Sequence, residues 1–394
     1  MKKQLVQQVT AHFNEQFNNE PEHIFLSPGR INIIGEHIDY NDGFVLPAAI
    51  NKYVCFAVSK NEGTDCTLIA KDLNDTYSIN LDDDLLPVDK MWVNFFLGVL
   101  QQLKEKGCSM TGFNIVFSST IPMGAGLSSS AAVECGFAYA LNTIFDLQLS
   151  KEQIALIGQK AEHTFVGVNC GIMDQFASVF GQKDKVIKLD CTTLQYEYHN
   201  ADFKDYTLLL LDSKVKHTHL TSGYNDRRNE VEKGLAILKK HDPEIKTFRD
   251  VSEAQVVAVK DKLGNVIFRR CHFVVGEIQR VLDAVDALEA QDFSKLGDLM
   301  FKTHDGLSND YEVSCEEIDF LVNAVRNDEN VIGSRMMGGG FGGCSINLVK
   351  KEAVDAVIER VTAAYQQQFN ITLDAYKVKI SEGTSIYTED YADI

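Results

Sequence analysis

Residues 113–145 constrain the fold more strongly than any other part of this chain of 394 residues. The β-branched and aromatic residues at 113–117 predict a strand. After Ser130 comes a run with the length and apolar content of a buried helix, AAVECGFAYALNTIF. Between them lies PMGAGLSSSAA, residues 122–132, so we expect its glycines and serines at the N-terminus of that helix.

This glycine- and serine-rich segment has the chemistry of a phosphate-binding loop. Backbone amides at a helix N-terminus lack partners within the helix and can bind phosphate. Gly124 and Gly126 permit a tight turn, while Ser128, Ser129 and Ser130 offer hydroxyl groups to phosphate or magnesium. The segment lacks the lysine of GxxxxGK[ST], which excludes a Walker loop. Taken alone, an ordinary serine-capped helix explains it equally well.

The rest of the chain predicts an α+β protein rather than a regular alternation of strand and helix. Residues 1–20 carry apolar side chains at a spacing of four, which indicates an amphipathic helix. Short strands are expected at 53–59, 67–70 and 77–81, and the second half is mostly helical up to residue 325. Length suggests about two domains, which we place at 1–205 and 206–394.

Composition narrows the classes of function. The net charge of −18 disfavours binding to a nucleic-acid backbone, which needs clustered Lys and Arg. The nine cysteines are scattered, never form CxxC, and are expected to be reduced core thiols. No run is long enough to cross a membrane and the first residues do not resemble a signal peptide. We therefore expect a cytoplasmic protein that binds neither nucleic acid nor membrane.

A second segment, residues 27–47, gathers polar side chains in SPGRINIIGEHIDYNDGFVLP. Arg30, Glu36, His37 and Asp39 fall at and beyond the end of the strand-like run 31–34. Several hydrogen-bonding groups are therefore expected to emerge together from one strand-to-loop junction, which suits a hydroxyl-rich ligand such as a sugar. The alternative for an isolated segment is a charged surface loop.

A third segment, residues 161–181, places two carboxylates on either side of a glycine-bearing turn. Glu162 is expected to end one helix and Asp174 to begin the next. The helix dipole and free amides would keep Asp174 ionised at neutral pH, although a first-turn Asp often has no further role. Cys170 is interpreted as a packing residue, because no histidine has an obvious place beside it.

The glycine-rich segment 336–349, MMGGGFGGCSINLV, contains GxGxxG without being a dinucleotide-binding fingerprint. That fingerprint opens a helix, whereas residues 345–349 alternate as a strand. Five glycines within residues 338–343 cost chain entropy, so either a ligand or another backbone must approach closely.

Together and in this order, the segments resemble the three signature motifs of the GHMP small-molecule kinases. GRINIIGEHIDYNDGFVLP is similar to the signature of the galactokinase family, PMGAGLSSSAA to the ATP loop, and MMGGGFGGC to the third motif. The resemblance implies an N-terminal domain like ribosomal protein S5 domain 2 and a C-terminal ferredoxin-like domain. The active site would lie between them.

The resemblance also implies roles for individual residues. Sugar hydroxyls would be held by Glu36, His37 and Asp39, with Tyr224 as a further contact. Ile38 stands where the family usually has threonine, so it is a candidate for altered sugar contacts. Asp174 would be the catalytic base and Arg30 the cation beside it, while Ser130 and Glu162 would bind Mg²⁺. The ATP phosphates would lie on Gly124, Ala125, Gly126, Leu127, Ser128, Ser129 and Ser130.

The expected activity is therefore transfer of phosphate from ATP, with Mg²⁺, to the C1 hydroxyl of galactose by a monomeric enzyme. A kinase for N-acetylgalactosamine or another modified sugar is the nearest alternative. A non-catalytic sensor of galactose and ATP is a further one, which the complete serine loop and the intact Asp174 and Arg30 disfavour. Trp92 is either an adenine contact or a core residue.

Overall fold

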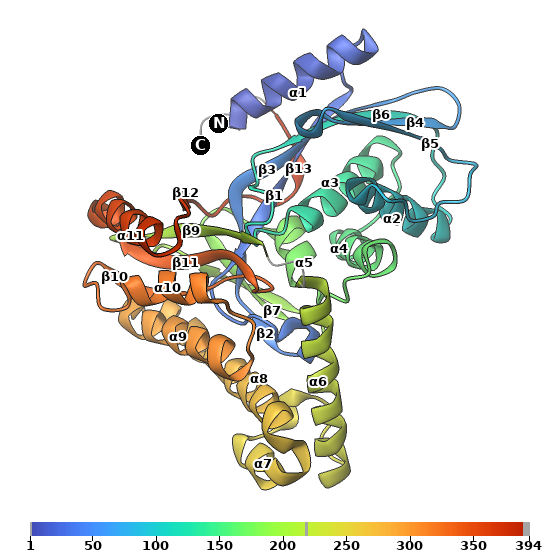
Figure 1. The fold of residues 1–394 in the computed structure, drawn as a ribbon. Helices are drawn as coiled ribbons and strands as arrows, with labels where there is room; N and C mark the ends of the chain where they lie inside the picture. The colour runs from blue at the N-terminus through green and yellow to red at the C-terminus, as the bar shows by residue number, and fades with distance from the viewer. Residues whose placement is uncertain (1, 217–219, 389–394) are drawn as a thin grey trace.

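The computed structural model describes residues 2–216 and 220–388, which form three β-sheets with helices packed around them (Figure 1). The largest sheet has the strand order β13-β1-β3-β6-β4-β5, with only β4 and β6 parallel among its neighbouring pairs. Its strands are β1 (His23–Asn32), β3 (Pro47–Lys60), β4 (Asp65–Ala70), β5 (Asp75–Asn80), β6 (Phe113–Ser119) and β13 (Ser385–Ile386). Because β13 pairs with β1, the end of the described chain returns to the N-terminal sheet.

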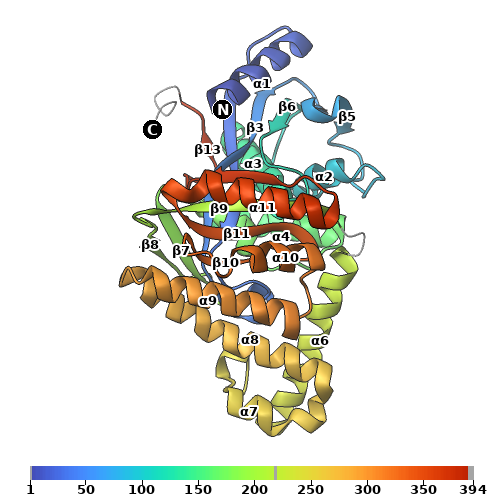
Figure 2. The ribbon, with the colours of Figure 1, turned by 60° about the vertical axis from the view of Figure 1, so that its left-hand side comes forward.

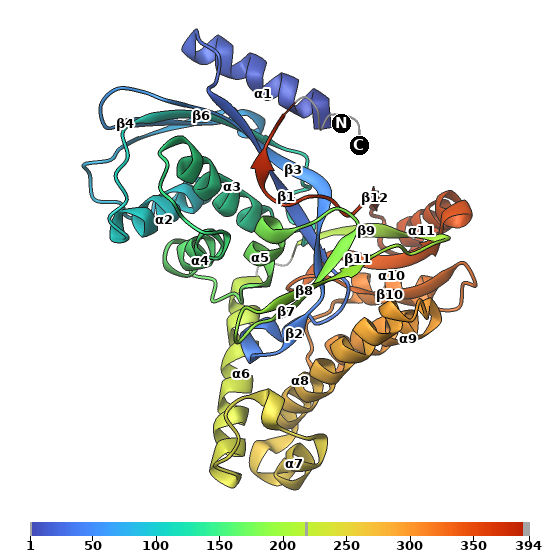
Figure 3. The same ribbon diagram turned by 180° about the vertical axis from the view of Figure 1, so that it is seen from behind.

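Helices cover both faces of this sheet. On one face lies α1 (Lys2–Phe17), which buries Leu5, Val9 and Phe13 against β3 and β6. Figure 3 shows a further group of helices on the opposite face of this sheet. They are α2 (Met91–Glu105), α3 (Ser129–Ile144), α4 (Lys151–Ala161) and α5 (Met173–Phe180). Their apolar residues belong to the main hydrophobic core.

A second, fully antiparallel sheet has the order β10-β11-β9-β12 and carries the third glycine-rich motif between β10 and β11. Its strands are β9 (Tyr206–Lys216), β10 (Val331–Met336), β11 (Gly342–Lys350) and β12 (Asp374–Val378). The helices α9 and α10 pack against these strands, and α11 packs on α10 (Figure 2). They span α9 (Phe293–Asp305), α10 (Glu316–Val325) and α11 (Val354–Phe369).

A small third sheet and a helical arm complete the fold. The sheet contains β2 (Phe44–Val45), β7 (Lys185–Asp190) and β8 (Tyr196–Asn200). The arm extends away from the sheets in Figure 1 and consists of α6 (Leu220–His241), α7 (Glu253–Ala258) and α8 (Lys260–Glu289). None of the helices in the described ranges combines the length and hydropathy that a membrane span requires.

The predicted α+β class is confirmed, and so are the helix after Ser130 and the start of a helix beside Asp174. One local prediction is wrong: the strand near 31–34 is really β1, which ends at Asn32, so Arg30 lies inside it. Glu162 is the C-terminal cap of α4, as predicted, and a π-helical turn follows directly. The domain division at 205 stays a prediction.

Candidate active site

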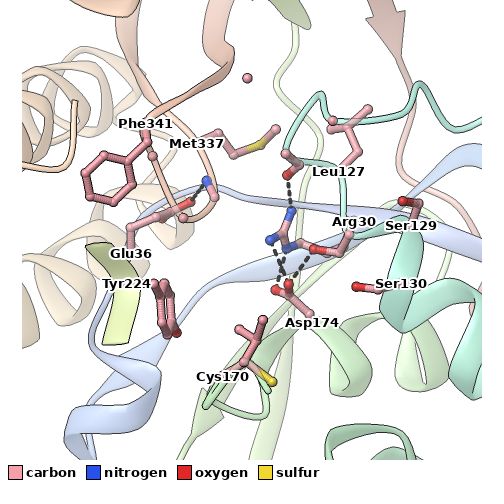
Figure 4. A pocket seen from close by; sticks show the side chains of 18 of the residues that line it. Arg30, Glu36, Leu127, Ser129, Ser130, Cys170, Asp174, Tyr224, Met337 and Phe341 are labelled. Carbon is pink, nitrogen blue, oxygen red and sulfur yellow. Dashed lines mark hydrogen bonds and ion pairs between the residues drawn. The ribbon is translucent and has the colours of Figure 1, made fainter. Parts of the chain in front are cut away.

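A cavity of about 340 Å³ lies where β1 and its following loop meet α3, α5, α6 and the loop 337–343 (Figure 4). It contains side chains or backbone from all the segments singled out in the sequence. Every residue to which the sequence assigned a site role lines it except Ala125 and Ile38. Trp92, which the sequence left between an adenine contact and the core, does not line it and packs against Phe96 and Phe117. Residues that lie far apart in the sequence therefore meet in one concave site, as ligand sites generally require.

Ala125 and Ile38 are the two predicted contacts that the structure does not bring to the cavity. The methyl group of Ala125 is buried, and its backbone faces Gly343. The side chain of Ile38 is fully buried beneath Gly43, and its carbonyl accepts hydrogen bonds from the amides of Asn41 and Gly43. An isoleucine here fills the core under residues 27–47, which we call the sugar segment because of its expected ligand, so an apolar side chain is accommodated.

At the centre of the cavity, Arg30 and Asp174 form a two-pronged ion pair. Arg30 Nε donates to Asp174 Oδ1 at 2.7 Å and Nη2 donates to Oδ2 at 3.0 Å. The third nitrogen, Nη1, donates to the carbonyl of Gly126 at 2.5 Å. Arg30 is only 3% exposed, so its planar guanidinium holds both the Asp174 carboxylate and the loop 122–132 in fixed positions.

Residues 122–132, which we call the phosphate loop because of their expected ligand, reach the same carboxylate through Ser128, whose hydroxyl donates to Asp174 Oδ2 at 2.5 Å. Ser128 precedes α3 in the left-handed backbone region, with φ of 55°, and its side chain makes no capping bond to the helix. The first amides of α3 therefore keep the unpaired donors that suit an anion. Gly124 and Gly126, also at positive φ, shape the turn before them.

Ser130 and Glu162 provide the oxygens that could hold a divalent cation. The Ser130 hydroxyl donates to Glu162 Oε1 at 3.1 Å, and Gln175 Nε2 donates to Glu162 Oε2 at 3.1 Å. Burial, followed by the charge of Asp174, raises the pKa of Glu162 to about 7, which bound positive charge would oppose.

The donor set fits Mg²⁺ in the way that phosphate-transferring enzymes use it. In the described part of the chain, no group of three or more His, Cys, Asp or Glu side chains could hold a metal by itself. Mg²⁺ commonly binds through one or two protein oxygens together with substrate phosphates and water. Ser130 and Glu162 could supply those oxygens beside the phosphate loop.

Asp39 brings the sugar segment against the turn that precedes Asp174. A Cβ atom added at Gly171 would collide with the Asp39 carboxylate, so glycine is required there. Burial, with a further contribution from the Asp174 charge, raises the pKa of Asp39 to about 7. The carboxylates of Asp39 and Asp174 thus both face the cavity, where ligand hydroxyl groups can donate to them.

Glu36 is buried, with 1% exposure, and joins the sugar segment to the third glycine-rich motif. Its Oε2 accepts from Asn32 Nδ2 at 2.6 Å and pairs with Arg335 Nη1 at 2.9 Å. Its Oε1 accepts from the Gly338 amide at 3.0 Å. Oε2 is therefore saturated by protein donors, whereas Oε1 accepts only from Gly338 and keeps acceptor capacity.

His37 belongs to a buried chain of hydrogen bonds. Its Nε2 lies 3.2 Å from the Gly339 carbonyl, which only accepts, so Nδ1 must accept from the Tyr40 hydroxyl at 2.8 Å. Tyr40 in turn lies 2.9 Å from the Tyr311 hydroxyl. Burial lowers the pKa of His37 to about 3, so the ring is neutral. The Tyr224 ring packs on His37 at 5.3 Å between centroids.

Two glycines of the loop 337–343 are explained by the close approach of another backbone. A Cβ atom at Gly338 would lie 3.1 Å from the Gly126 carbonyl oxygen, and one at Gly343 would lie 3.3 Å from the Ala125 carbonyl. Both residues also have positive φ. The third motif therefore packs directly on the phosphate loop while it holds Glu36 and His37.

Several residues of the site escaped the sequence analysis. Asn32 and Arg335 hold Glu36, Tyr40 and Tyr311 hold His37, and Gln175 holds Glu162. Four of these five lie within three residues of a residue singled out in the sequence. Their position next to a motif is the feature from which they could have been predicted. Tyr311 lies in none of the motifs, and only the fold brings it there.

Sequence comparisons point to one family. Residues 94–182 match the GHMP kinases N terminal domain, residues 284–367 the GHMP kinases C terminal domain, and residues 11–60 the galactokinase galactose-binding signature. A galactokinase of Thermotoga petrophila is 42% identical over 91% of this chain and 98% of its own length. One of Clostridium perfringens is 39% identical over 94% of this chain and 97% of its own length.

Structural comparisons agree. Lactococcus lactis galactokinase, solved in complex with galactose, is 33% identical and superimposes with a TM-score of 0.92 over 95% of this chain and 98% of its own. The mevalonate kinase of Methanococcus jannaschii, at 19% identity and a TM-score of 0.65 over 92% of this chain and 99% of its own, shares the fold. The predicted two-domain GHMP kinase fold is confirmed, and the chain belongs to the galactokinase family of ATP-dependent sugar kinases.

Proposed function

We propose that this protein transfers the γ-phosphoryl group of ATP to the C1 hydroxyl of D-galactose, giving galactose 1-phosphate and ADP. The proposal is supported by full-length similarity to proteins named galactokinase and by the likeness to one solved with galactose. The observation that carries it is the position of the Arg30–Asp174 pair between the phosphate loop and the polar sugar cluster. A transferred phosphoryl group and a sugar hydroxyl would meet there.

Asp174 acts as the base in this proposal. Its Oδ2 already accepts from Ser128 and from Arg30 Nη2, whereas Oδ1 accepts only from Arg30 Nε. Oδ1 therefore keeps a lone pair with which it accepts the proton of the C1 hydroxyl. Phosphoryl transfer has a loose transition state, so a carboxylate of ordinary basicity is sufficient for this late proton transfer.

Arg30 has two tasks. It holds the Asp174 carboxylate in one orientation, and its positive charge lies beside the Gly126 end of the phosphate loop. Charge that develops on the transferred phosphoryl oxygens is stabilised by a preorganised guanidinium at low energetic cost. Positioning and charge neutralisation account for most of the catalysis in this class of reaction.

Ser130 and Glu162 would hold Mg²⁺, with Gln175 orienting the Glu162 carboxylate. The bound ion supplies positive charge to the ATP phosphates. On the sugar side, Asp39 and Glu36 supply carboxylate acceptors for hydroxyl groups, and Tyr224 covers the cavity from α6. These acceptors would fix the sugar so that C1 faces Asp174.

The test is ADP release with Mg·ATP over a panel of galactose, N-acetylgalactosamine, glucose and mannose. We expect the highest kcat/KM with galactose and a product phosphorylated at C1. A higher kcat/KM with N-acetylgalactosamine would contradict the choice of substrate. Binding of both galactose and ATP without ADP release would contradict catalysis and indicate a sensor.

A further inference from the structure

Arg335, in β10, is an arginine with no exposed surface and no role in the proposed reaction. Its Nε donates to the Ile33 carbonyl at 2.7 Å, and Nη1 donates to the Met336 carbonyl at 2.6 Å. Nη2 donates to the Asn32 carbonyl. Each nitrogen of the guanidinium therefore has a partner, and two of the three carbonyls belong to the sugar segment.

The guanidinium of Arg335 also balances the negative charge of Glu36, the buried acid that faces the proposed sugar site. Arg335 Nη1 lies 2.9 Å from Glu36 Oε2, and the two side chains are 0% and 1% exposed. Taking an unpaired carboxylate out of water is costly, so a buried glutamate stays ionised only with such a partner and good hydrogen bonds. Arg335 and Asn32 together fill the acceptor sites of Oε2, which leaves Oε1 to face the cavity.

We propose that Arg335 is a positioning residue for sugar recognition, which orients Glu36 so that Oε1 accepts one hydrogen bond from one sugar hydroxyl. This inference rests on the proposed function, because it presupposes that the cavity binds a sugar. It assigns part of the sugar affinity to Arg335, which does not line the cavity. The Gly338 amide, at 3.0 Å from Oε1, fixes the direction of the remaining lone pair. Arg335 and Gly338 flank the start of the third motif, so that motif shapes the sugar site.

The role predicts a selective effect on ligand binding. A hydrogen bond to a charged group contributes enough affinity that its loss weakens binding about 10- to 100-fold. The deoxygalactose that lacks the hydroxyl bound by Glu36 should show this loss with the parent protein. Arg335→Met and Glu36→Gln should then weaken galactose binding and remove most of the difference between galactose and that one deoxy sugar.

The experiment is calorimetric titration of the nucleotide-free protein with galactose and its 2-, 3-, 4- and 6-deoxy forms. Glu36→Gln keeps the shape of the buried side chain and serves if Arg335→Met does not fold. Arg335→Lys keeps the charge but not the fork, so it should restore part of the discrimination. Arg249→Met, which removes an ion pair of 2.7 Å to Asp190 away from the cavity, is the control and should leave the deoxy profile unchanged.

The outcomes separate the two proposals. The inference is supported if Glu36→Gln and the Arg335 variants lose discrimination at the same sugar position. It is overturned if they weaken all five sugars by the same factor or leave the profile as in the parent, as a purely structural arginine would. If the parent protein binds none of the sugars, the proposed function itself fails.

Discussion

Replacement of Arg30 tests the proposed reaction centre most informatively, because one guanidinium holds both Asp174, the proposed base, and the phosphate loop. Arg30→Met removes two hydrogen bonds to Asp174 and one to the Gly126 carbonyl, and leaves Asp174 with Ser128 alone. Asp174 is 28% exposed, so water can solvate its freed carboxylate and we expect the protein to fold.

The expected loss is large and concentrated in kcat. An arginine that stabilises a transferring phosphoryl group contributes about a thousandfold or more to the rate, or about 4 kcal/mol. Arg30→Lys can place one ammonium near either Asp174 oxygen but cannot bridge both oxygens and the carbonyl, so kcat should fall between the parent and Arg30→Met.

The assay combines kcat from ADP release with calorimetric affinities for galactose and ATP, so that chemistry and binding are separated. Arg249→Met serves as the control, since it removes an arginine–aspartate pair outside the cavity and should change kcat by about twofold or less. If Arg30→Met kept more than about a tenth of kcat, the assignment of Arg30 to transition-state stabilisation would be wrong.

Three further predictions address the rest of the cavity. Since burial and Asp174 raise the pKa of Asp39 from 3.8 to about 7, folding takes up a proton between those values and stability falls as pH rises through about 7. Asp39→Asn should therefore raise the Tm of the ligand-free protein more at pH 8 than at pH 5, and equal shifts would contradict the argument. Glu162→Gln should raise the Mg²⁺ concentration needed for half-maximal rate without weakening galactose binding. An unchanged Mg²⁺ requirement would show that Glu162 does not bind the cation. Gly338→Ala forces a side chain to φ of 82° and to 3.1 Å from the Gly126 carbonyl oxygen, so it should lower Tm and weaken galactose binding, and normal values for both would refute the packing argument.

The sequence predicted much of the fold because its local patterns are strong. The helix at α1 follows from apolar residues at a spacing of four, and α3 follows from a long apolar run behind a serine. Strand boundaries were less accurate around Arg30, since β1 runs from His23 and pairs along its length with β3. Pairing partners, rather than local composition, decide where such a strand ends.

The site was predictable where its chemistry is carried by the motifs and unpredictable where it depends on distant partners. Arg30, Asp174 and Glu162 were expected at the site and do meet there. Arg335 lies about 300 positions from Glu36 in the sequence, and no local pattern predicts that pairing. Tertiary contacts of this kind set the environment of a side chain without leaving a local pattern.

The position of Ile38 shows the limit of a motif match. The family pattern suggested that a residue within the sugar segment contacts sugar, yet its side chain points into the core beneath Gly43. In this segment Glu36, His37 and Asp39 line the cavity, whereas Ile38 between them is buried in the core. The motif alone therefore does not state which of its residues reach the ligand.

The most direct test of the proposed reaction is a single-turnover experiment with γ-labelled ATP, Mg²⁺ and galactose in which the product is identified by NMR. The parent protein should form galactose 1-phosphate, and Asp174→Asn should bind both substrates while the transfer rate falls by about a hundredfold or more, as expected for loss of a base. Transfer by Asp174→Asn at the parent rate, or phosphate found on another hydroxyl of the sugar, would contradict the mechanism.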